Sequence, residues 1–241
     1  MIEYKNVRKY YGDNIGVDDI NVKIEDGEFA FLVGPSGAGK STFVKLLLRL
    51  INADSGSIMC NGYEVTELSN RMIPAHRRSV GIIFQDFSLL PKKTVSENIA
   101  FAMEITGRSR RSIRRHVPQM LELVGIPNEG DKYPHEISIG EQQRVAVARA
   151  IVNNPSVIIA DEPTGNLDPD TGWEIMRLLE QINRRGTTVI MVTHSKDIVN
   201  AMGKRVIAIR HGHIIRDEKS GFYHPDDDGL VPGKDDEVFV L

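Results

Sequence analysis

A glycine-rich stretch near the N-terminus has the composition of a loop that binds phosphate. Residues Gly34 to Ser41 read GPSGAGKS and fit the pattern G-x-x-x-x-G-K-[ST]. The stretch follows an apolar run at 28–33 and opens a helical pattern at 41–50, which is the strand–loop–helix context that this chemistry needs. Glycines allow tight turns whose backbone N–H groups converge on phosphate oxygens, and the next helix adds the positive end of its dipole. We therefore predict a nucleoside triphosphate site here.

Two side chains of this loop have predicted chemical roles. Lys40 is placed to reach the β- and γ-phosphates, and the Ser41 hydroxyl is placed to ligate Mg²⁺. A glycine-rich turn without a ligand is the alternative, and the flanking elements argue against it. The candidate nucleotide-binding residues are Gly34, Pro35, Ser36, Gly37, Ala38, Gly39, Lys40, Ser41 and Thr42.

Charged or titratable side chains follow two further apolar runs. Asp161 and Glu162 come directly after the run at 157–160, and His194 follows the run at 187–192. Asp161 is placed to hold Mg²⁺, and Glu162 to polarise a water molecule for attack on the γ-phosphorus. Two acids after a strand also commonly cap a helix, but the phosphate loop requires a partner of this kind. At the carboxyl edge of a nucleotide-binding sheet, a histidine can reach the γ-phosphate.

The elements that must position these residues alternate between strands and helices. Strands are predicted at 20–24, 28–33, 80–84, 157–160 and 187–192, and helices at 41–50 and 172–184. Continuous β-branched strands between helices predict a mostly parallel sheet with helices on both faces. Helical patterns broken at Gly107, at Pro118 and at 125–127 predict an inserted helical segment at about 86–150.

The composition restricts the class of protein. The chain has 241 residues, with 30 Lys and Arg against 33 Asp and Glu, a net charge of −3 that gives no general reason to expect nucleic-acid binding. No apolar run is long enough to cross a bilayer, and the first residues lack the apolar core of a signal peptide. Cys60 is the only cysteine, so an intrachain disulfide is impossible. We expect a soluble cytoplasmic protein.

Charge is distributed unevenly along the chain. Residues 217–241 hold eight acids and two bases, a formal charge of −6, which leaves residues 1–216 at +3. We predict that 217–241 is an acidic, loosely docked tail. A second cluster is basic and consists of Arg108, Arg110, Arg111, Arg114 and Arg115. It is either a solvated helix face or a surface for anionic lipid headgroups or an acidic partner.

Taken together and in this order, the motifs over about 1–216 resemble the ATP-binding subunits of ABC transporters. Gln85 resembles the Q-loop glutamine, Asp168 the D-loop aspartate and His194 the switch histidine. Residues 137–144 (ISIGEQQR) are similar to the family signature, with Ile139 where the first glycine usually stands. The resemblance implies an α/β fold with a P-loop NTPase (RecA-like) core of mostly parallel sheet, an antiparallel β-subdomain and an inserted α-helical subdomain.

The resemblance also implies the cofactors, the assembly and the roles of residues. ATP and Mg²⁺ are bound, the metal by Ser41, Gln85 and Asp161, and Lys40, Gln85, Glu162 and His194 are the catalytic residues. A head-to-tail homodimer places the signature of one chain on the ATP of the other. The signature residues implied in that contact are Ser138, Gly140, Glu141 and Gln142. Tyr11 matches the aromatic residue that stacks on adenine, although the sequence does not distinguish it from the adjacent Tyr10.

A narrower resemblance is to the cell-division ATPases of this family. Asp86 and Phe87 after the Q-loop glutamine favour that group over the ATPases of lipoprotein release and macrolide export. The group pairs with a membrane protein of the FtsX type, lies on the inner face of the cell membrane and regulates cell-wall hydrolases indirectly. The partner is expected near Gln85–Phe101, where Phe87, Leu89 and Leu90 form either local core or a docking surface.

Other classes of nucleotide-binding protein would carry motifs of their own. A P-loop GTPase would carry an N-K-x-D motif, and the chain has none. A DNA-repair ATPase would carry a long coiled coil between Lys40 and Ser138, and the interval is too short for one. The ATPase subunit of a lipoprotein, macrolide or peptide exporter and a non-enzymatic ATP-dependent scaffold both stay open.

Overall fold

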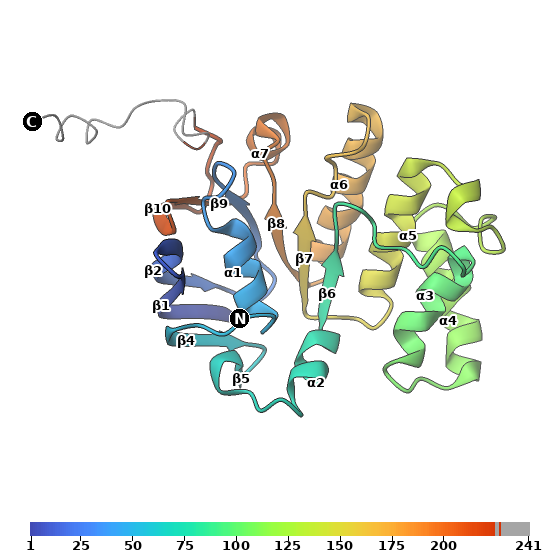
Figure 1. Ribbon diagram of the computed structural model, residues 1–241. Coiled ribbons are helices and arrows are strands. Elements are labelled where there is room, and N and C mark those ends of the chain that lie inside the picture. The colour runs from blue at the N-terminus through green and yellow to red at the C-terminus, as the bar shows by residue number, and fades with distance from the viewer. Residues whose placement is uncertain (225–226, 228–241) are drawn as a thin grey trace, which may run out of the picture. The chain divides into compact units, whose positions relative to one another are not determined.

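The computed structural model describes residues 1–224 and 227, and the chain forms two compact units within them (Figure 1). The helical unit consists of residues 1, 25–29 and 67–193. The phosphate-loop unit consists of residues 2–24, 30–66 and 194 onward.

The phosphate-loop unit contains an antiparallel sheet and a second group of strands beside a helix. The antiparallel sheet has the order β2-β1-β4-β5 and consists of β1 (Ile2–Tyr11), β2 (Asn14–Ile24), β4 (Ser55–Cys60) and β5 (Tyr63–Glu64). In the second group, β3 (Phe29–Val33) pairs in parallel with β9 (Arg205–Arg210), which pairs antiparallel with β10 (His213–Glu218). The helices are α1 (Lys40–Leu47), α7 (Lys196–Met202) and the 3₁₀ turn η1 (Val65–Glu67).

Side-chain packing fixes α1 on the antiparallel sheet. The rings of Tyr4 and Phe43 stack with their centroids 4.2 Å apart, and both side chains are fully or almost fully buried. The Tyr4 hydroxyl donates a hydrogen bond of 2.9 Å to the carbonyl of Phe43. Burial raises the pKa of Tyr4 well above its usual range, so this phenol stays a neutral donor. The helix that follows the phosphate loop therefore has a defined position relative to β1.

The helical unit contains a parallel sheet and five α-helices. Its strands β6 (Val80–Ile83), β7 (Val157–Asp161) and β8 (Thr188–Val192) are parallel neighbours in the order β8-β7-β6. The helices are α2 (Ile73–Arg78), α3 (Val95–Glu104), α4 (Arg110–Leu123), α5 (Ile139–Ile151) and α6 (Pro169–Arg184), with the 3₁₀ turn η2 (Pro134–Glu136) before α5. Helices α3, α4 and α5 pack on one another, as Figure 1 shows.

The expected α/β class with an antiparallel subdomain and a helical insertion is confirmed, while several boundaries differ. The strand expected at 20–24 is only the end of β2, which begins at Asn14. Helix α1 ends at Leu47 because the chain turns at Leu48 and adopts the left-handed region at Arg49. Strand β10 extends to Glu218, two residues beyond the expected boundary at 216. Most of the predicted acidic tail (225–226 and 228–241) lies outside the described residues.

Three of the predicted strands, β3, β7 and β8, are buried, whereas the apolar run at 80–84 is only partly so, because β6 ends at Ile83 and Phe84 is 40% exposed. Every residue of β3 and β8 is buried, as are the first four residues of β7. None of the helices within the described residues combines the length and the hydropathy that crossing a membrane needs.

Candidate functional site

The phosphate loop is built from glycines that no other residue could replace without strain. Gly34, Gly37 and Gly39 have φ angles of 146°, 77° and 114°, in the region that L-residues avoid. A Cβ atom on Gly39 would lie 2.5 Å from the Gly16 carbonyl oxygen, and one on Gly34 would collide with the carbonyl of Ile209. The loop therefore lies so close to neighbouring backbone that only glycine fits at Gly34 and Gly39.

Lys40 and the start of α1 supply positive charge to this loop. The Lys40 side chain is 7% exposed, and its ammonium donates to the carbonyls of Gly34 at 2.6 Å and Pro35 at 2.8 Å. Helix α1 has no side-chain N-cap and no acidic residue in its first turn. Its first N–H groups and dipole are therefore directed at the loop, which is the arrangement that binds phosphate.

The structure distinguishes the two adjacent tyrosines. Tyr11 is 45% exposed and lines a hollow of about 230 Å³ together with Ile15, Gly16 and residues 37–42. A Cβ on Gly16 would lie 2.7 Å from the Tyr11 ring, so this glycine makes room for it. Tyr10 instead donates its hydroxyl to Asp18 at 2.9 Å. Only Tyr11 of the pair is therefore positioned to contact a base bound beside the loop.

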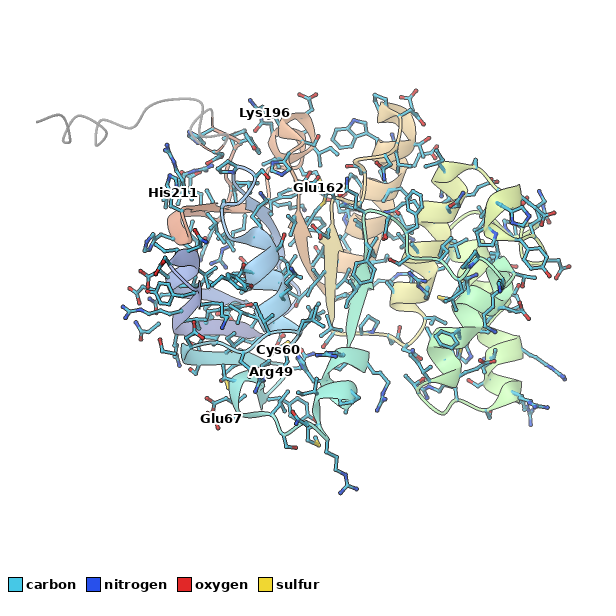
Figure 2. The ribbon with its side chains drawn as sticks, viewed as in Figure 1. Arg49, Cys60, Glu67, Glu162, Lys196 and His211 are labelled. Carbon is cyan, nitrogen blue, oxygen red and sulfur yellow. The ribbon has the colours of Figure 1, made fainter. Side chains whose placement is uncertain are left out.

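In the helical unit, β7 ends at the predicted carboxylates. Asp161 is the last residue of β7, in register with Val192 of β8, and the Glu162 N–H donates to the Val192 carbonyl at 3.0 Å. Glu162 has a φ of 47°, an uncommon conformation for a residue with a side chain. Figure 2 labels Glu162 at the carboxyl end of β7. The chain thus turns sharply after Asp161, so the extended conformation of β7 does not continue to Glu162.

Gln85 lies beside the same strand end. Its carbonyl accepts a hydrogen bond of 2.9 Å from the Asn166 side chain. A Cβ on Gly165 would lie 3.5 Å from the Gln85 side-chain nitrogen and 3.5 Å from the Glu162 carbonyl oxygen. The structure therefore brings Gln85, Glu162 and the segment that precedes Asp168 together. Asn166 is a member of this cluster whose contact with Gln85 the sequence did not reveal.

The signature segment forms the N-terminus of α5. Ser138 is the N-cap in a reciprocal capping box: its Oγ accepts from the Glu141 N–H at 3.3 Å, and its own N–H donates to the Glu141 carboxylate at 2.8 Å. The Ser138 hydroxyl also donates to that carboxylate at 2.7 Å, and this hydrogen bond lowers the pKa of Glu141. Gln142 donates to the Ile137 carbonyl at 3.3 Å. Glu141 and Gln142 therefore hold the signature segment in its conformation through hydrogen bonds within that segment.

Gly140 and Asp168 meet on one hollow of the helical unit. A Cβ on Gly140 would lie 2.7 Å from the Thr171 methyl group, so α5 and α6 approach closely here. Asp168 caps α6 by accepting from the Thr171 N–H at 3.0 Å, and the Thr171 hydrogen bond lowers the pKa of Asp168. The hollow has a volume of about 500 Å³ and is lined by Ser138, Gly140 and Asp168 among others. Ile139 is 53% exposed, so the side chain that replaces the usual glycine is not crowded within α5.

His194 is exposed and follows Thr193, which is completely buried beyond the end of β8. Ser195 then begins α7. The strand-end position expected for the switch histidine is therefore present.

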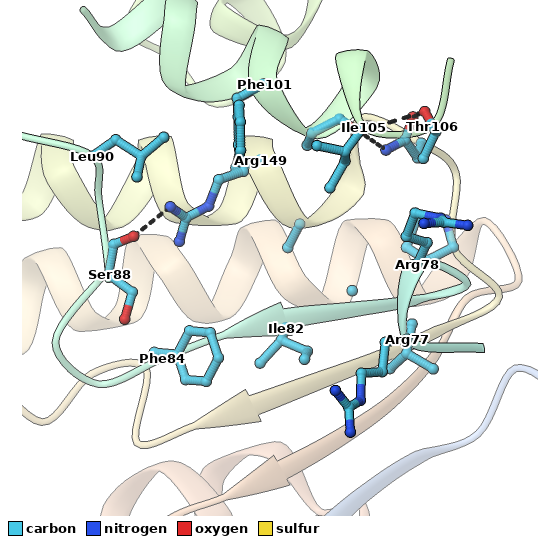
Figure 3. A pocket seen from close by; sticks show the side chains of 16 residues that line it. Arg77, Arg78, Ile82, Phe84, Ser88, Leu90, Phe101, Ile105, Thr106 and Arg149 are labelled. Atoms are coloured by element: carbon cyan, nitrogen blue, oxygen red, sulfur yellow. Dashed lines mark hydrogen bonds between the residues drawn. The ribbon is translucent and has the colours of Figure 1, made fainter. Parts of the chain in front are cut away.

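A groove in the helical unit contains two exposed side chains outside the expected partner region at 85–101, Phe84 and Ile105, together with Phe101 at the end of that region. Phe84, Phe101 and Ile105 are 40%, 37% and 50% exposed and line a groove of about 410 Å³, which Figure 3 shows from close by. Of the three apolar residues expected as core or docking surface, only Leu90 lines it, and all three are half-buried. The groove joins residues from β6 and α3, whose proximity no local pattern could reveal.

Arg149 of α5 crosses one wall of this groove. Its guanidinium donates to the carbonyls of Ser88 at 2.5 Å and Phe87 at 2.7 Å. Phe87 and Ser88 have φ angles of 60° and 45°. Burial lowers the pKa of Arg149. The segment that follows Gln85 is therefore held in an uncommon conformation by a side chain of the signature helix.

The predicted metal ligands have suitable chemistry for Mg²⁺. Ser41, Gln85 and Asp161 offer hydroxyl, carboxamide and carboxylate oxygens, which are the hard donors that Mg²⁺ prefers. Residues 1–224 and 227 contain no group of three or more His, Cys, Asp or Glu side chains that would hold a metal alone. This donor set fits an ion that completes its coordination with phosphate oxygens and water.

Comparisons with known proteins show the family of the chain. Residues 17–165 match the family model described as ABC transporter. The chain is 53% identical over 228 residues to "Cell division ATP-binding protein FtsE" of Streptococcus pneumoniae serotype 2 (strain D39), covering 94% of this chain and 99% of the relative. It is 53% identical over 224 residues to the protein of the same name from Bacillus subtilis (strain 168), covering 92% and 98%.

Among solved structures, the chain resembles the dimeric ATP-binding cassette MJ0796 in a post-hydrolysis state bound to ADP and Pi. The TM-score is 0.82 at 33% sequence identity, and the match covers 92% of this chain and 100% of the other.

Proposed function

Because the chain belongs to the ABC transporter family of ATP-binding proteins, we propose that it is the ATP-hydrolysing subunit of an FtsE-like complex, in which an FtsX-like membrane protein transmits its conformational change to cell-wall hydrolases. The observation that carries the ATPase assignment is the phosphate loop, with buried Lys40 and the uncapped start of α1 directed at it. The sequence identity of 53% to relatives named FtsE, which extends over almost their full length, supports the cell-division role. The working location is peripheral, on the inner face of the cell membrane.

ATP binding uses residues of the phosphate-loop unit. The backbone N–H groups of 34–42 and the Lys40 ammonium hold the β- and γ-phosphates, and Tyr11 stacks on the adenine. Lys40 then exchanges its bonds to the Gly34 and Pro35 carbonyls for bonds to phosphate oxygens. Mg²⁺, held by Ser41, Gln85 and Asp161, neutralises phosphate charge when bound.

Hydrolysis then requires a base and a means to hold the γ-phosphate. The Glu162 carboxylate accepts a proton from the attacking water as the water oxygen bonds to the γ-phosphorus. The bond from that phosphorus to the β,γ-bridging oxygen breaks, which leaves ADP and phosphate. His194 holds the γ-phosphate, and Asp168 belongs to the D-loop that faces the second chain.

The proposed assembly is a homodimer in which Ser138 and Gly140 of one chain contact the ATP bound by the other. Support comes from the dimeric relative with 33% identity and from the geometry of the signature. Ser138 and Gly140 both line one open hollow on the helical unit. ATP then forms part of the interface, so its hydrolysis opens the dimer.

The groove of the helical unit is the proposed docking surface for the membrane partner. Its wall is apolar, with Phe84, Phe101 and Ile105 exposed, and its rim carries Arg77 and Arg78 (Figure 3). An amphipathic helix that places apolar side chains in the groove and acidic side chains at the rim fits this surface.

The ATPase assignment is tested by Glu162→Gln. The variant loses the base but keeps the loop, so we expect ATP binding to persist, turnover to fall by orders of magnitude, and an ATP-bound dimer to accumulate in size-exclusion chromatography. Glu122→Gln is the matched control, because it makes the same chemical change at an exposed position of α4. Wild-type turnover in Glu162→Gln contradicts the assignment of the base.

The partner assignment is tested separately. We expect an FtsX-like protein in lipid nanodiscs to bind the wild-type chain, Ile105→Glu to abolish binding, and Leu50→Glu to leave it intact. Leu50 is 52% exposed, close to the 50% of Ile105, and lies outside the groove. The alternative, the ATPase subunit of a lipoprotein, macrolide or peptide exporter, gains support if an exporter permease binds and stimulates the ATPase while the FtsX-like protein does neither.

A further inference from the structure

A basic face on the helical unit has no role in the proposed ATPase cycle. It consists of Arg108, Arg110, Arg111, Arg114 and Arg115, all exposed, on the segment before α4 and on its first half. Within residues 1–224 and 227, none of these guanidinium groups forms an ion pair. Arg144 and Arg205, in contrast, pair with Glu174 and Asp217 at 2.5 and 2.7 Å.

The local sequence of α4 is unfavourable for an isolated helix. Arg110 and Arg114, like Arg111 and Arg115, are four residues apart, which places like charges on adjacent turns. The first turn contains no acidic residue, although α3, α5 and α6 each have one. Positive charge at a helix N-terminus opposes the helix dipole. An external anionic surface would relieve both effects.

The chain runs from the partner groove directly into the basic face. Ile105 and Thr106 line the groove, and Arg108 follows two residues later, with its N–H bonded to the Met103 carbonyl of α3 at 3.1 Å. Ser109 then caps α4. Figure 1 shows α3 and α4 side by side. If a membrane protein fills the groove, the basic face therefore begins within three residues of that contact along the chain.

We propose that this basic face binds anionic phospholipid headgroups and so holds the chain against the membrane beside its partner. The orientation rests on the proposed function, whereas binding to lipid does not. The arginines at 110–115 cover about 140° of the helix circumference, a broad surface that suits a plane of headgroups. No large exposed hydrophobic side chain lies at 108–116, so the face lacks the apolar anchor typical of a protein interface.

The test measures co-sedimentation of the full chain with vesicles. We expect binding to vesicles of equal parts phosphatidylglycerol and phosphatidylcholine, no binding to pure phosphatidylcholine, and loss of binding at high salt. Each arginine near such a surface contributes roughly fivefold, so Arg110→Gln/Arg111→Gln/Arg114→Gln should weaken binding about a hundredfold. ATP hydrolysis in detergent-free buffer should stay at the wild-type rate.

The control is Arg177→Gln/Arg184→Gln/Arg185→Gln, which removes three exposed arginines on and just after α6. It should bind vesicles like the wild-type chain.

Three outcomes overturn the proposal. The first two are equal binding to both vesicle types and no binding to either. The third is that the α4 variant no longer binds the FtsX-like partner in lipid-free detergent, because that result would identify the basic face as a contact for an acidic protein. The proposed function is judged independently by Glu162→Gln and Ile105→Glu, so its failure is distinguishable from failure here.

Discussion

Replacement of Arg149 by alanine tests whether the signature helix holds the segment that follows Gln85. The change removes two hydrogen bonds from a guanidinium to the carbonyls of Phe87 and Ser88, at 2.7 and 2.5 Å. A hydrogen bond to a charged group contributes about 1.5–3 kcal/mol. Two effects offset this loss. The freed carbonyl of Ser88 regains water, because Ser88 is exposed. The left-handed conformations of Phe87 and Ser88, which cost about 1 kcal/mol each, can also relax.

The net loss of unfolding free energy should therefore be about 2 kcal/mol, which lowers the Tm by roughly 4–8 °C for a chain of this size. The loss is local. Hydrogen exchange followed by mass spectrometry should find faster exchange of the amides at 86–90, with little change in β7. Because the same segment borders the partner groove, ATPase stimulation by an FtsX-like partner should fall more than basal ATPase.

Arg144→Ala provides the matched control. Arg144 also lies on α5 and also binds a loop carbonyl, that of Val124 at 2.7 Å, together with Glu174. It does not contact 85–90, so its loss should lower stability without raising exchange there. Unchanged exchange at 86–90 in Arg149→Ala, or equal effects of the two substitutions on that segment, would refute the reasoning.

Three further predictions concern the proposed ATP site and the signature. Lys40→Ala should abolish detectable ATP binding in a fluorescent-nucleotide titration and remove about 3 kcal/mol of transition-state stabilisation; unchanged ATPase activity would contradict the whole site. Tyr11→Ala should weaken ATP binding by about 1–3 kcal/mol in calorimetry while Tyr10→Ala leaves it unchanged, and equal effects would remove Tyr11 from the site. Glu141→Gln should lower stability most above the ordinary carboxyl pKa of about 4.3, because the Ser138 hydrogen bonds that lower the pKa of Glu141 stabilise its charged form. That difference should vanish in urea titrations as the pH falls through the lowered pKa, and a difference independent of pH would show that the carboxylate charge is not involved.

The sequence alone determined the chemistry and the order of its parts. Local patterns in the sequence identify the phosphate loop with its glycines and Lys40. They also identify the acids after the run at 157–160 and Ser138 before α5. Such patterns are set by backbone sterics and by hydrogen bonds between residues three or four apart, as in the capping box of Ser138 and Glu141. Buried strands were predicted for the same reason, because β-branched runs are a local signal.

Contacts between residues that are distant in the sequence followed only from the tertiary structure. Tyr11 rather than Tyr10 lies at the phosphate loop because β1 places their rings differently and Gly16 of β2 leaves space for only one of them. The Arg149 guanidinium donates to the carbonyls of Phe87 and Ser88, which lie about sixty residues earlier in the chain. The exposed groove gathers Phe84 and Phe101 from different elements. These contacts depend on how complete helices and strands pack, and packing is a property of surfaces that no short window of sequence contains.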